Sequence, residues 1–278
     1  ATIIASTTAG TTALLDLNGF NQGVLSLTFG GTGATATSVN NVATGAGTLT
    51  LGGNVTFTAT NNPLGSTISG NLNLGSATRT FTIGDSTGAA DDLTITAIIS
   101  GTGGLTKAGA GKLTLSGNNT YSGTTTLSAG TLRATTSANA LGAGALSLGG
   151  GTLELANDTA LNFGRNTTVT AATTIKSDRL TSGAAVTHTL GTLSQGAFAL
   201  TGAAGTNVAS GTAGIDFGTA TFTGAPTFSP GTGFQFGLGA LTDGGVARAM
   251  VKNGLGSLIF NATAASFAAA NTLTINNG

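Results

Sequence analysis

The chain of 278 residues has no cysteine, no tryptophan and a single histidine, and only 6% of its residues are charged. The absence of cysteine is compatible with the cytosol and with the cell exterior alike. A lone histidine without cysteines or a second histidine cannot form a zinc site or a nucleophilic triad. No apolar run approaches the roughly 20 residues of a membrane-spanning helix. Nine acidic and nine basic residues leave no net charge, and the basic residues form no Lys/Arg cluster, which argues against nucleic acid and anionic membrane partners.

The scarcity of charge has a physical explanation in a stacked parallel sheet. Equivalent positions on successive turns of such a stack lie about 4.8 Å apart. Like charges at that distance repel each other by roughly 1 kcal/mol even in water. A long ladder therefore favours Thr, Ser, Asn and Gly on its outer surface. Hydrophobic residues still make up 40% of the chain, which is enough for a sizeable core.

Short alternating segments separated by glycine and asparagine fill the chain, which contains 47 glycines. The clearest example runs from Gly101 to Leu132, where residues 112–115 (KLTL) and 124–127 (TTTL) place Thr beside Leu. A period of two with Thr between apolar residues predicts half-buried strands. Residues 117–119 (GNN) predict the corner between them, because Gly and Asn adopt positive φ at low cost.

The same pattern recurs twice along the chain. Residues 45–57 align without gaps onto 109–121, and residues 251–260 align onto 106–115. After one inserted residue, Phe267 takes the place of Tyr121. An apolar pair, a Gly/Asn corner, an aromatic residue and another strand thus return in one order. An internal repeat of this kind predicts stacked structural units.

The stretch resembles the passenger-associated repeat of bacterial autotransporters and related giant surface proteins. The resemblance rests on residues 103–107 (GGLTK), 111–117, 119–123 (NTYSG) and 124–132, and residues 15–22 (LDLNGFNQ) are similar to a companion signature of the same proteins. What the resemblance implies is a right-handed parallel β-helix that is secreted and displayed outside the cell. It implies no substrate and no catalytic residue.

We therefore predict an all-β fold, a right-handed single-stranded parallel β-helix (β-solenoid) of about a dozen rungs, at about 20 to 25 residues per rung. No linker or compositional break appears, so residues 1–278 are expected to form a single solenoid domain, a segment or module of a longer repetitive chain. The residues expected in the structural core are Leu49, Leu51, Phe57, Leu113, Leu115, Tyr121, Leu127, Leu258, Phe260, Phe267 and Leu273.

Phenylalanine is concentrated between residues 215 and 238. Phe217, Phe222, Phe228, Phe234 and Phe236 fall nearly one per short strand. In a solenoid this spacing predicts an internal aromatic stack, which is a commoner arrangement than an exposed aromatic surface for a ligand.

The candidate chemical residues are few. His188 lies in a short alternation and is expected to be a structural or surface residue. The spacing of Asp85, Asp91 and Asp92 fits neither the EF-hand loop nor the glycine-rich calcium-binding nonapeptide, so a solvated corner is expected there. Residues 103–112 lack the phosphate-loop spacing, because Thr106 stands where a glycine is required. Apart from Asp91–Asp92 the acids are scattered singly, so no enzyme activity, catalytic residue, metal or cofactor is predicted.

Repeated Thr-x-Thr pairs, such as Thr94 and Thr96, suggest a hydroxyl array like that of ice-binding solenoids. An ice face requires Thr at one position of every turn, and the spacing of these pairs in the sequence is irregular. Thr is also a common outward residue of any strand. Ice binding is therefore disfavoured.

The main functional prediction is a structural extracellular protein, a rigid rod that stacks head to tail with copies of itself into a cell-surface fibre or coat. The alternative is an autotransporter-type adhesin, in which the rod presents a binding loop to a cell-surface partner. No signal peptide is present, so a signal and a membrane anchor are expected outside these residues.

The assembly prediction rests on the ends of the sequence. Residues 273–278 followed by residues 1–6 parallel the order of residues 127–136, which predicts unfinished turns at both ends. Ile3, Ile4, Leu273 and Ile275 are the residues expected to make the contact between copies or the continuation of a tandem array, because open solenoid ends are templates for pairing.

Overall fold

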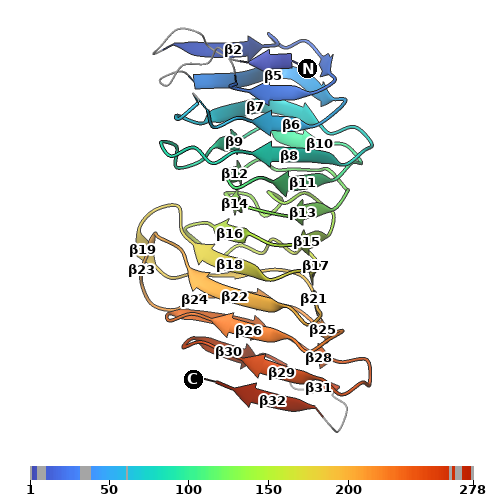
Figure 1. Ribbon diagram of the computed structural model, residues 1–278, viewed down its shortest axis with the longest axis vertical. Helices are drawn as coiled ribbons and strands as arrows, with labels where there is room; N and C mark the ends of the chain where they lie inside the picture. The colour runs from blue at the N-terminus through green and yellow to red at the C-terminus, as the bar shows by residue number, and fades with distance from the viewer. Residues whose placement is uncertain are drawn as a thin grey trace. The chain divides into compact units, whose positions relative to one another are not determined.

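The protein is described by a computed structural model over residues 2–4, 11–31, 39–60, 62–262, 265–266 and 271–276. Every regular element among these residues is a β-strand, and they include no helix that could cross a membrane. The chain divides into two compact units, unit 1 (Ala1–Gly144) and unit 2 (Ala145–Gly278). Each unit is built from parallel strands that wind around its own core (Figure 1).

Unit 1 contains two parallel sheets whose strands alternate along the sequence. The first sheet has the order β1 (Thr2–Ile4), β4 (Leu27–Phe29), β6 (Val55–Phe57), β8 (Arg79–Ile83), β11 (Leu105–Ala108) and β13 (Thr125–Leu127). The second sheet has the order β2 (Thr12–Asp16), β5 (Val39–Leu51), β7 (Ser66–Asn73), β9 (Leu93–Ile95), β12 (Lys112–Leu115) and β14 (Thr131–Thr135). In addition, β3 (Gln22–Val24) pairs with β5, and β10 (Ile98–Ser100) pairs with β7.

Unit 2 repeats this plan and adds a third sheet. Its first sheet contains β15 (Leu146–Leu148), β17 (Thr167–Val169), β21 (Leu193–Gln195), β25 (Ala220–Phe222), β28 (Leu241–Thr242) and β31 (Ala265–Ser266). Its second sheet contains β16 (Thr152–Ala156), β18 (Thr173–Asp178), β22 (Ala199–Ala204), β26 (Thr227–Pro230), β29 (Ala249–Lys252) and β32 (Thr272–Ile275). The third contains β20 (Thr187–Thr189), β24 (Ala213–Phe217), β27 (Phe234–Leu238) and β30 (Ser257–Phe260). A separate pair joins β19 (Gly183–Ala184) to β23 (Val208–Ser210).

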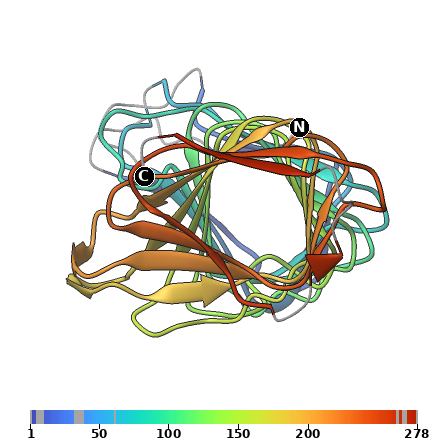
Figure 2. The same ribbon diagram turned by 90° about the horizontal axis from the view of Figure 1, so that it is seen from below.

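Neighbouring strands of one sheet are separated by a full turn of chain, so the fold is a coil. Figure 2 looks at the coil from below and shows successive strands entering different sheets. This confirms the predicted all-β parallel β-solenoid, with about ten turns in place of about a dozen. The count is lower because corners vary in length, and paired residues are from 19 (Leu113 to Leu132) to 28 (Leu27 to Val55) residues apart. The right-handed winding and the single domain over 1–278 stay predictions.

The core is a set of apolar ladders, because inward residues of successive strands lie in register. In unit 1, for example, Leu93 pairs with Leu113, which pairs with Leu132, and all three are fully buried. Of the residues expected in the core, those buried with an exposed fraction of at most 1% are Leu49, Leu51, Phe57, Leu113, Leu115, Tyr121 and Leu127.

The aromatic stack predicted in unit 2 is confirmed. All five phenylalanines between residues 217 and 236 are buried. Phe234 and Phe236 have ring centroids 5.0 Å apart and meet edge to face, and Phe236 meets Phe228 in the same way at 5.8 Å. Edge-to-face contact is the favoured geometry of packed aromatic rings, so these rings fill the interior between the sheets of unit 2.

The structure does not bury every residue expected in the core. Phe260 is 42% exposed, Leu273 is 44% exposed and Leu258 is half-buried. The reason is their position, since β30 and β32 are the outermost described strands of their sheets and lack a neighbour on one side. Phe267 lies outside the described residues.

Replacing Leu115 by Asp tests the core ladder of unit 1. Leu115 pairs with Ile95 and Ala134 and is fully buried, so Asp would place an unpaired charge between apolar neighbours. We expect the free energy of unfolding to fall by about 3–5 kcal/mol. The fluorescence of Tyr121, the only tyrosine of a chain without tryptophan, reports the unfolding of unit 1. Thr126→Asp, which changes an outward residue of β13, is the control and should cost less than about 1 kcal/mol.

Candidate functional sites on the solenoid

The repeat stretch of unit 1 contains a buried lysine at a corner. Lys107 on β11 is fully buried, and its Nζ donates hydrogen bonds to the carbonyl oxygens of Ala108 (3.0 Å), Gly109 (2.8 Å) and Ala129 (3.0 Å). These three acceptors use all three N–H groups of the ammonium. Burial lowers the pKa of Lys107 to about 8, and the charge of Asp92 partly opposes this effect. The ammonium therefore binds the corners of two successive turns together.

The downstream copy of the repeat in unit 2 has the same corner. Lys252, which aligns with Lys107, is buried, and its Nζ donates to the carbonyl oxygen of Gly254 at 2.7 Å. Gly254 has a φ of +78°, and the equivalent Gly109 has a φ of +77°. In both copies the glycine takes a left-handed conformation that turns its carbonyl toward the lysine.

Asn119 connects three successive turns of unit 1. It is 2% exposed, its Oδ1 accepts from the Ile99 amide at 2.8 Å, and its Nδ2 donates to the Ala140 carbonyl at 2.7 Å. A buried amide whose donor and acceptor are both used stabilises the corner, since unpaired buried polar groups are costly. The asparagine of the NTYSG segment is thus a structural residue.

Tyr121 lies inside the same corner. Its hydroxyl group is 2.6 Å from Oγ1 of Thr125, which donates to the Leu141 carbonyl at 2.8 Å. The ring leaves no room for a side chain at Gly142, where an added Cβ would lie 2.5 Å from the ring carbons. The repeat signature therefore specifies a packed and fully hydrogen-bonded corner.

Asp92 corrects the expectation of a solvated corner. The side chain is 2% exposed, and its two oxygens accept hydrogen bonds from the backbone amides of Ser86 and Lys112, each at 2.7 Å. Its neighbour Asp91 lies nearer the surface and forms an ion pair with the Lys112 ammonium at 3.1 Å. One of the two adjacent acids thus connects corners inside the fold, and the other is a surface group.

Replacing Asp92 by Ala is expected to lower the free energy of unfolding of unit 1 by about 2 kcal/mol or more, because two buried amides lose their acceptor. Asp91→Ala is the matched control and should cost less than about 1 kcal/mol, as is usual for a surface ion pair. Urea denaturation followed by Tyr121 fluorescence measures both. Equal stability of the two variants would contradict the structural role of Asp92.

His188 is an internal structural residue of unit 2. It is fully buried on β20, its Nδ1 accepts from the Leu161 amide at 3.1 Å, and its Nε2 donates to the Asp178 carbonyl at 3.1 Å. The ring also meets Phe163 edge to face at 5.8 Å. Burial lowers the pKa of His188, against the opposing effect of the hydrogen bond to Asp178. Within the described residues no three His, Cys, Asp or Glu side chains gather to hold a metal ion.

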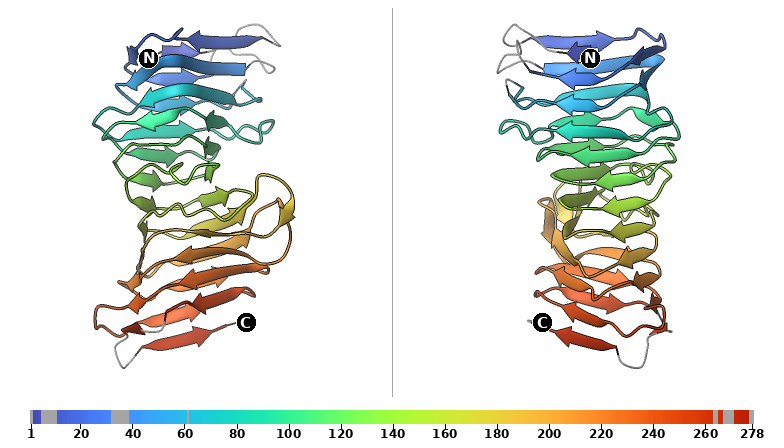
Figure 3. Two further views of the ribbon diagram at one scale, coloured as in Figure 1. Left: turned by 180° about the vertical axis from the view of Figure 1, so that it is seen from behind. Right: turned by 45° about the vertical axis from the view of Figure 1, so that its right-hand side comes forward.

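Unit 2 also has a feature that sequence reasoning missed, a lateral projection formed by residues 179–186 and 205–212. These segments connect β18 to β20 and β22 to β24, and they pair with each other through β19 and β23. Figure 3 shows them standing out sideways from the sheets of unit 2. The only sequence signal was the greater length of the corners in this part of the chain.

The base of the projection is held by Arg179 and Asp158. The guanidinium group donates to the carbonyl oxygens of Asp158 (2.8 Å) and Ala184 (3.0 Å) and lies 3.5 Å from the Asp158 carboxylate. That carboxylate accepts from the backbone amides of Leu180 (3.1 Å) and Thr181 (2.9 Å). The hydrogen bond from the Thr181 amide is the largest of the effects that lower the pKa of Asp158.

The second segment of the projection is bound to the first through Asn207. Its amide N–H donates to Asp178 Oδ1 at 2.9 Å, and its Nδ2 donates to the Arg179 carbonyl at 2.9 Å. Gly205 leaves room for this contact, since an added Cβ would lie 2.0 Å from the Asp178 carboxyl carbon. The base is polar and fully connected, whereas Leu180, Thr206 and Ser210 are exposed on the outside.

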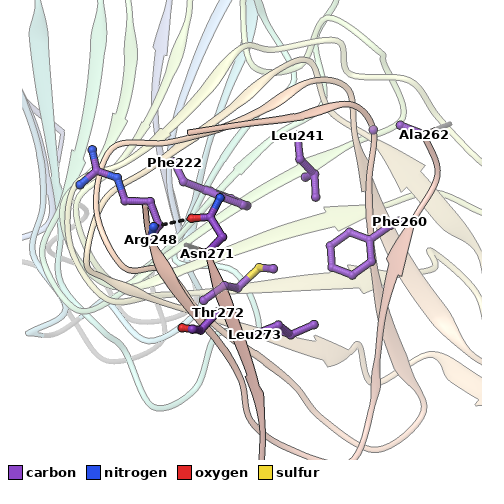
Figure 4. Close-up of a pocket in the computed structure, with 10 residues that line it drawn as sticks. Phe222, Leu241, Arg248, Phe260, Ala262, Asn271, Thr272 and Leu273 are labelled. Atoms are coloured by element: carbon purple, nitrogen blue, oxygen red, sulfur yellow. Dashed lines mark hydrogen bonds between the residues drawn. The ribbon is translucent and has the colours of Figure 1, made fainter. Parts of the chain in front are cut away.

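A hollow lies at the last described strands of unit 2. Figure 4 shows its lining, which includes Phe222, Leu241, Arg248, Phe260 and Leu273 around a volume of about 340 Å³. The backbone amide of Arg248 donates to the side chain of Asn271. The lining is mainly apolar, and the described residues that form it include no Asp or Glu.

The residues predicted to make end contacts differ in exposure. Leu273 and Ile275 on β32 are 44% and 63% exposed, whereas Ile4 on β1 is buried at 5%. The backbone of Ile3 pairs with Thr28, and its side chain lies outside the described residues. An exposed apolar edge is therefore present at β32.

Comparisons with known proteins agree with this geometry. Residues 105–134 match the family described as the passenger-associated-transport-repeat, which confirms the resemblance. The matched segment contains the corners of Lys107, Asn119 and Tyr121. The chain thus contains a repeat of the kind named for autotransporter passengers, on a parallel β-solenoid.

Part of the chain is also similar to a curated protein. Over 132 residues, which are 45% of this chain, the sequence is 44% identical to the adhesin BmaC autotransporter of Brucella suis biovar 1 (strain 1330). The aligned part of the chain spans 4% of the length of that adhesin. No solved structure matches the chain.

Proposed function

We propose that this chain is part of the passenger of an autotransporter-type adhesin, secreted to the bacterial cell surface, where it contacts a cell-surface partner. The observation that carries the proposal is the 44% identity to an autotransporter adhesin. The passenger-associated repeat at residues 105–134 supports the same assignment. The 4% coverage of the adhesin also supports the view that residues 1–278 are a solenoid segment of a longer repetitive chain.

In this proposal the solenoid is the stalk and the lateral projection is the binding loop. The base of the projection is cross-connected by Arg179, Asp158 and Asn207. Binding surfaces are commonly loops held on a rigid scaffold, and a loop that is already ordered loses little conformational entropy on binding. Its exposed residues are neutral, which favours a partner recognised by shape and hydrogen bonds.

The proposal assigns no enzymatic activity to the chain. The side chains best suited to acid–base or nucleophilic chemistry are Lys107, Asp92 and His188. Each is buried and hydrogen-bonded to backbone groups. A catalytic group must reach its substrate, and these groups are occupied inside the fold.

The adhesin proposal predicts that beads coated with the purified chain bind cultured epithelial cells. Leu180→Arg combined with Ser210→Arg should reduce the number of bound beads at least fivefold, because both residues are exposed on the projection. Leu64→Arg combined with Ser76→Arg is the matched control, since these residues are exposed in unit 1. Wild-type beads that bind no better than uncoated beads would refute the adhesin role. Equal losses of binding in both variants would refute the role of the projection as the binding loop.

Head-to-tail fibre formation is a second proposal, favoured by the apolar edge of β32. Leu273 and Ile275 are exposed there, and an uncovered strand edge is a template for pairing with another chain. In this arrangement a second copy, or a further turn of the same chain, would cover the edge through its own first strands.

Sedimentation velocity over increasing protein concentration tests the fibre. We expect larger species for the wild type and their loss in Leu273→Asp combined with Ile275→Asp. The two carboxylates would lie at the contact between one copy and the next and would disfavour stacking. Leu64→Asp, at an exposed leucine of unit 1, is the control. A wild-type protein that stays monomeric at the highest concentration would contradict this proposal.

A further inference from the structure

The outer face of the first sheet of unit 2 presents one hydroxyl group on each of five neighbouring strands. The register pairs Ser147 with Thr168, Thr168 with Ser194, Ser194 with Thr221, and Thr221 with Thr242. These residues belong to β15, β17, β21, β25 and β28, which lie side by side in Figure 1. Adjacent hydroxyls are therefore about 4.8 Å apart along the stack. We call these five residues and the rows beside them the hydroxyl face.

The five hydroxyl groups are available to a ligand. Thr168 is exposed, and the other four residues are intermediate in exposure. Among the described residues, the side chains of Ser147, Thr168, Ser194 and Thr221 have no hydrogen-bond partner, and Oγ1 of Thr242 accepts a hydrogen bond from the Gly244 amide at 3.4 Å. Their sequence neighbours on the strands, such as Leu146, Leu193 and Phe222, are buried. Each hydroxyl can donate one hydrogen bond and accept two, from a backbone that the sheet holds in place.

The hydroxyl face carries no charge. The rows that flank the hydroxyls lie two residues before and two residues after them on each strand. They contain Ala145, Asn166, Thr192, Thr219 and Ala240 on one side, and Gly149, Thr170, Gly196, Thr223 and Gly244 on the other. The face therefore has no ionic attraction for an anionic or cationic ligand, and it matches a neutral one with many hydroxyl groups.

The face also alternates from one strand to the next. Ser147 and Ser194 are followed by glycine two residues later, whereas Thr168 and Thr221 are followed by threonine. Over β15, β17, β21 and β25, a glycine without a side chain thus alternates with a threonine that stands out from the sheet. The period is two strand spacings, or about 9.6 Å. An ice face would require the same side chain on every turn. The disaccharide repeat of an extended β-1,4-linked glycan has nearly the same length as two strand spacings.

We propose that the hydroxyl face binds a neutral, extended polysaccharide that lies along the stack of strands. Each disaccharide of the ligand meets one Ser-x-Gly strand and one Thr-x-Thr strand, and the hydroxyls exchange hydrogen bonds with those of the sugars. Several weak contacts in fixed register add up along one polymer. The site lies on the first sheet, apart from the residues of the lateral projection, so it goes beyond the proposed adhesin function.

Depletion from solution by insoluble cellulose and by chitin tests the proposal with the whole chain. We expect the wild type to bind at least one of these neutral glycans. Thr168→Val combined with Thr221→Val, which removes two hydroxyls and keeps the shape and strand preference, should weaken that binding at least fivefold. Thr174→Val combined with Thr201→Val is the matched control, because these threonines pair in the same way on the second sheet of unit 2. Circular dichroism verifies that both variants fold.

Each other outcome has a defined meaning. Failure to bind either glycan, undiminished binding by the Thr168 and Thr221 variant, or an equal loss in the control would overturn the proposal. Tighter binding to heparin than to the neutral glycans would overturn its neutral character. Inhibition of ice recrystallisation without glycan binding would assign the face to ordered water instead. Glycan binding that survives Leu180→Arg combined with Ser210→Arg would separate this site from the projection, and its loss in that variant would contradict the site.

Discussion

Parallel stacking in register is the constraint on which the rest of this structure depends. A residue within a sheet has a paired residue about 4.8 Å away on each neighbouring strand, so most ladders repeat one chemical type. Inside, the ladders are Leu, Ile, Val and Phe, and outside they are mainly neutral. Some of the charged groups within the fold bind backbone groups near the turns of the chain, because backbone amides and carbonyls that are not paired in the sheets occur there. Lys107 and Asp92 supply such partners.

This constraint separates the parts of the chain that hold the fold from the parts free to vary. A strand position is tied to its neighbours on both sides, whereas a corner can lengthen without disturbing the ladder. Unit 2 shows the result, since two successive corners extend into the lateral projection while β18 and β22 keep their pairing. Recognition by such a protein is therefore expected at extended corners and on uncharged outer ladders, and not in a central pocket.

The fold could be predicted because its signals are local. Period-two alternation, Gly/Asn corners and the recurrence of residues 45–57 and 251–260 are visible within short windows. The turn count was too high because corner lengths differ. Contacts between turns could not be predicted, because the residues that make them are far apart in the sequence. The Asp92 carboxylate accepts from the Lys112 amide 20 positions away, and its burial has no local signature. The hydroxyl row was missed because turns of unequal length make its spacing look irregular in the sequence.

The buried ammonium of Lys107 has a consequence for how the coil finds its alignment. Its ladder in the first sheet of unit 1 is otherwise apolar, with Val55 and Phe81 on one side and Leu127 on the other. Turns whose inward residues are alike could slip past one another by a whole turn with little loss of apolar contact. Three carbonyls at one corner meet the ammonium only in the native alignment. A slipped coil would leave the ammonium of Lys107 unpaired among apolar side chains. This lysine therefore favours the native alignment of the turns over a slipped one.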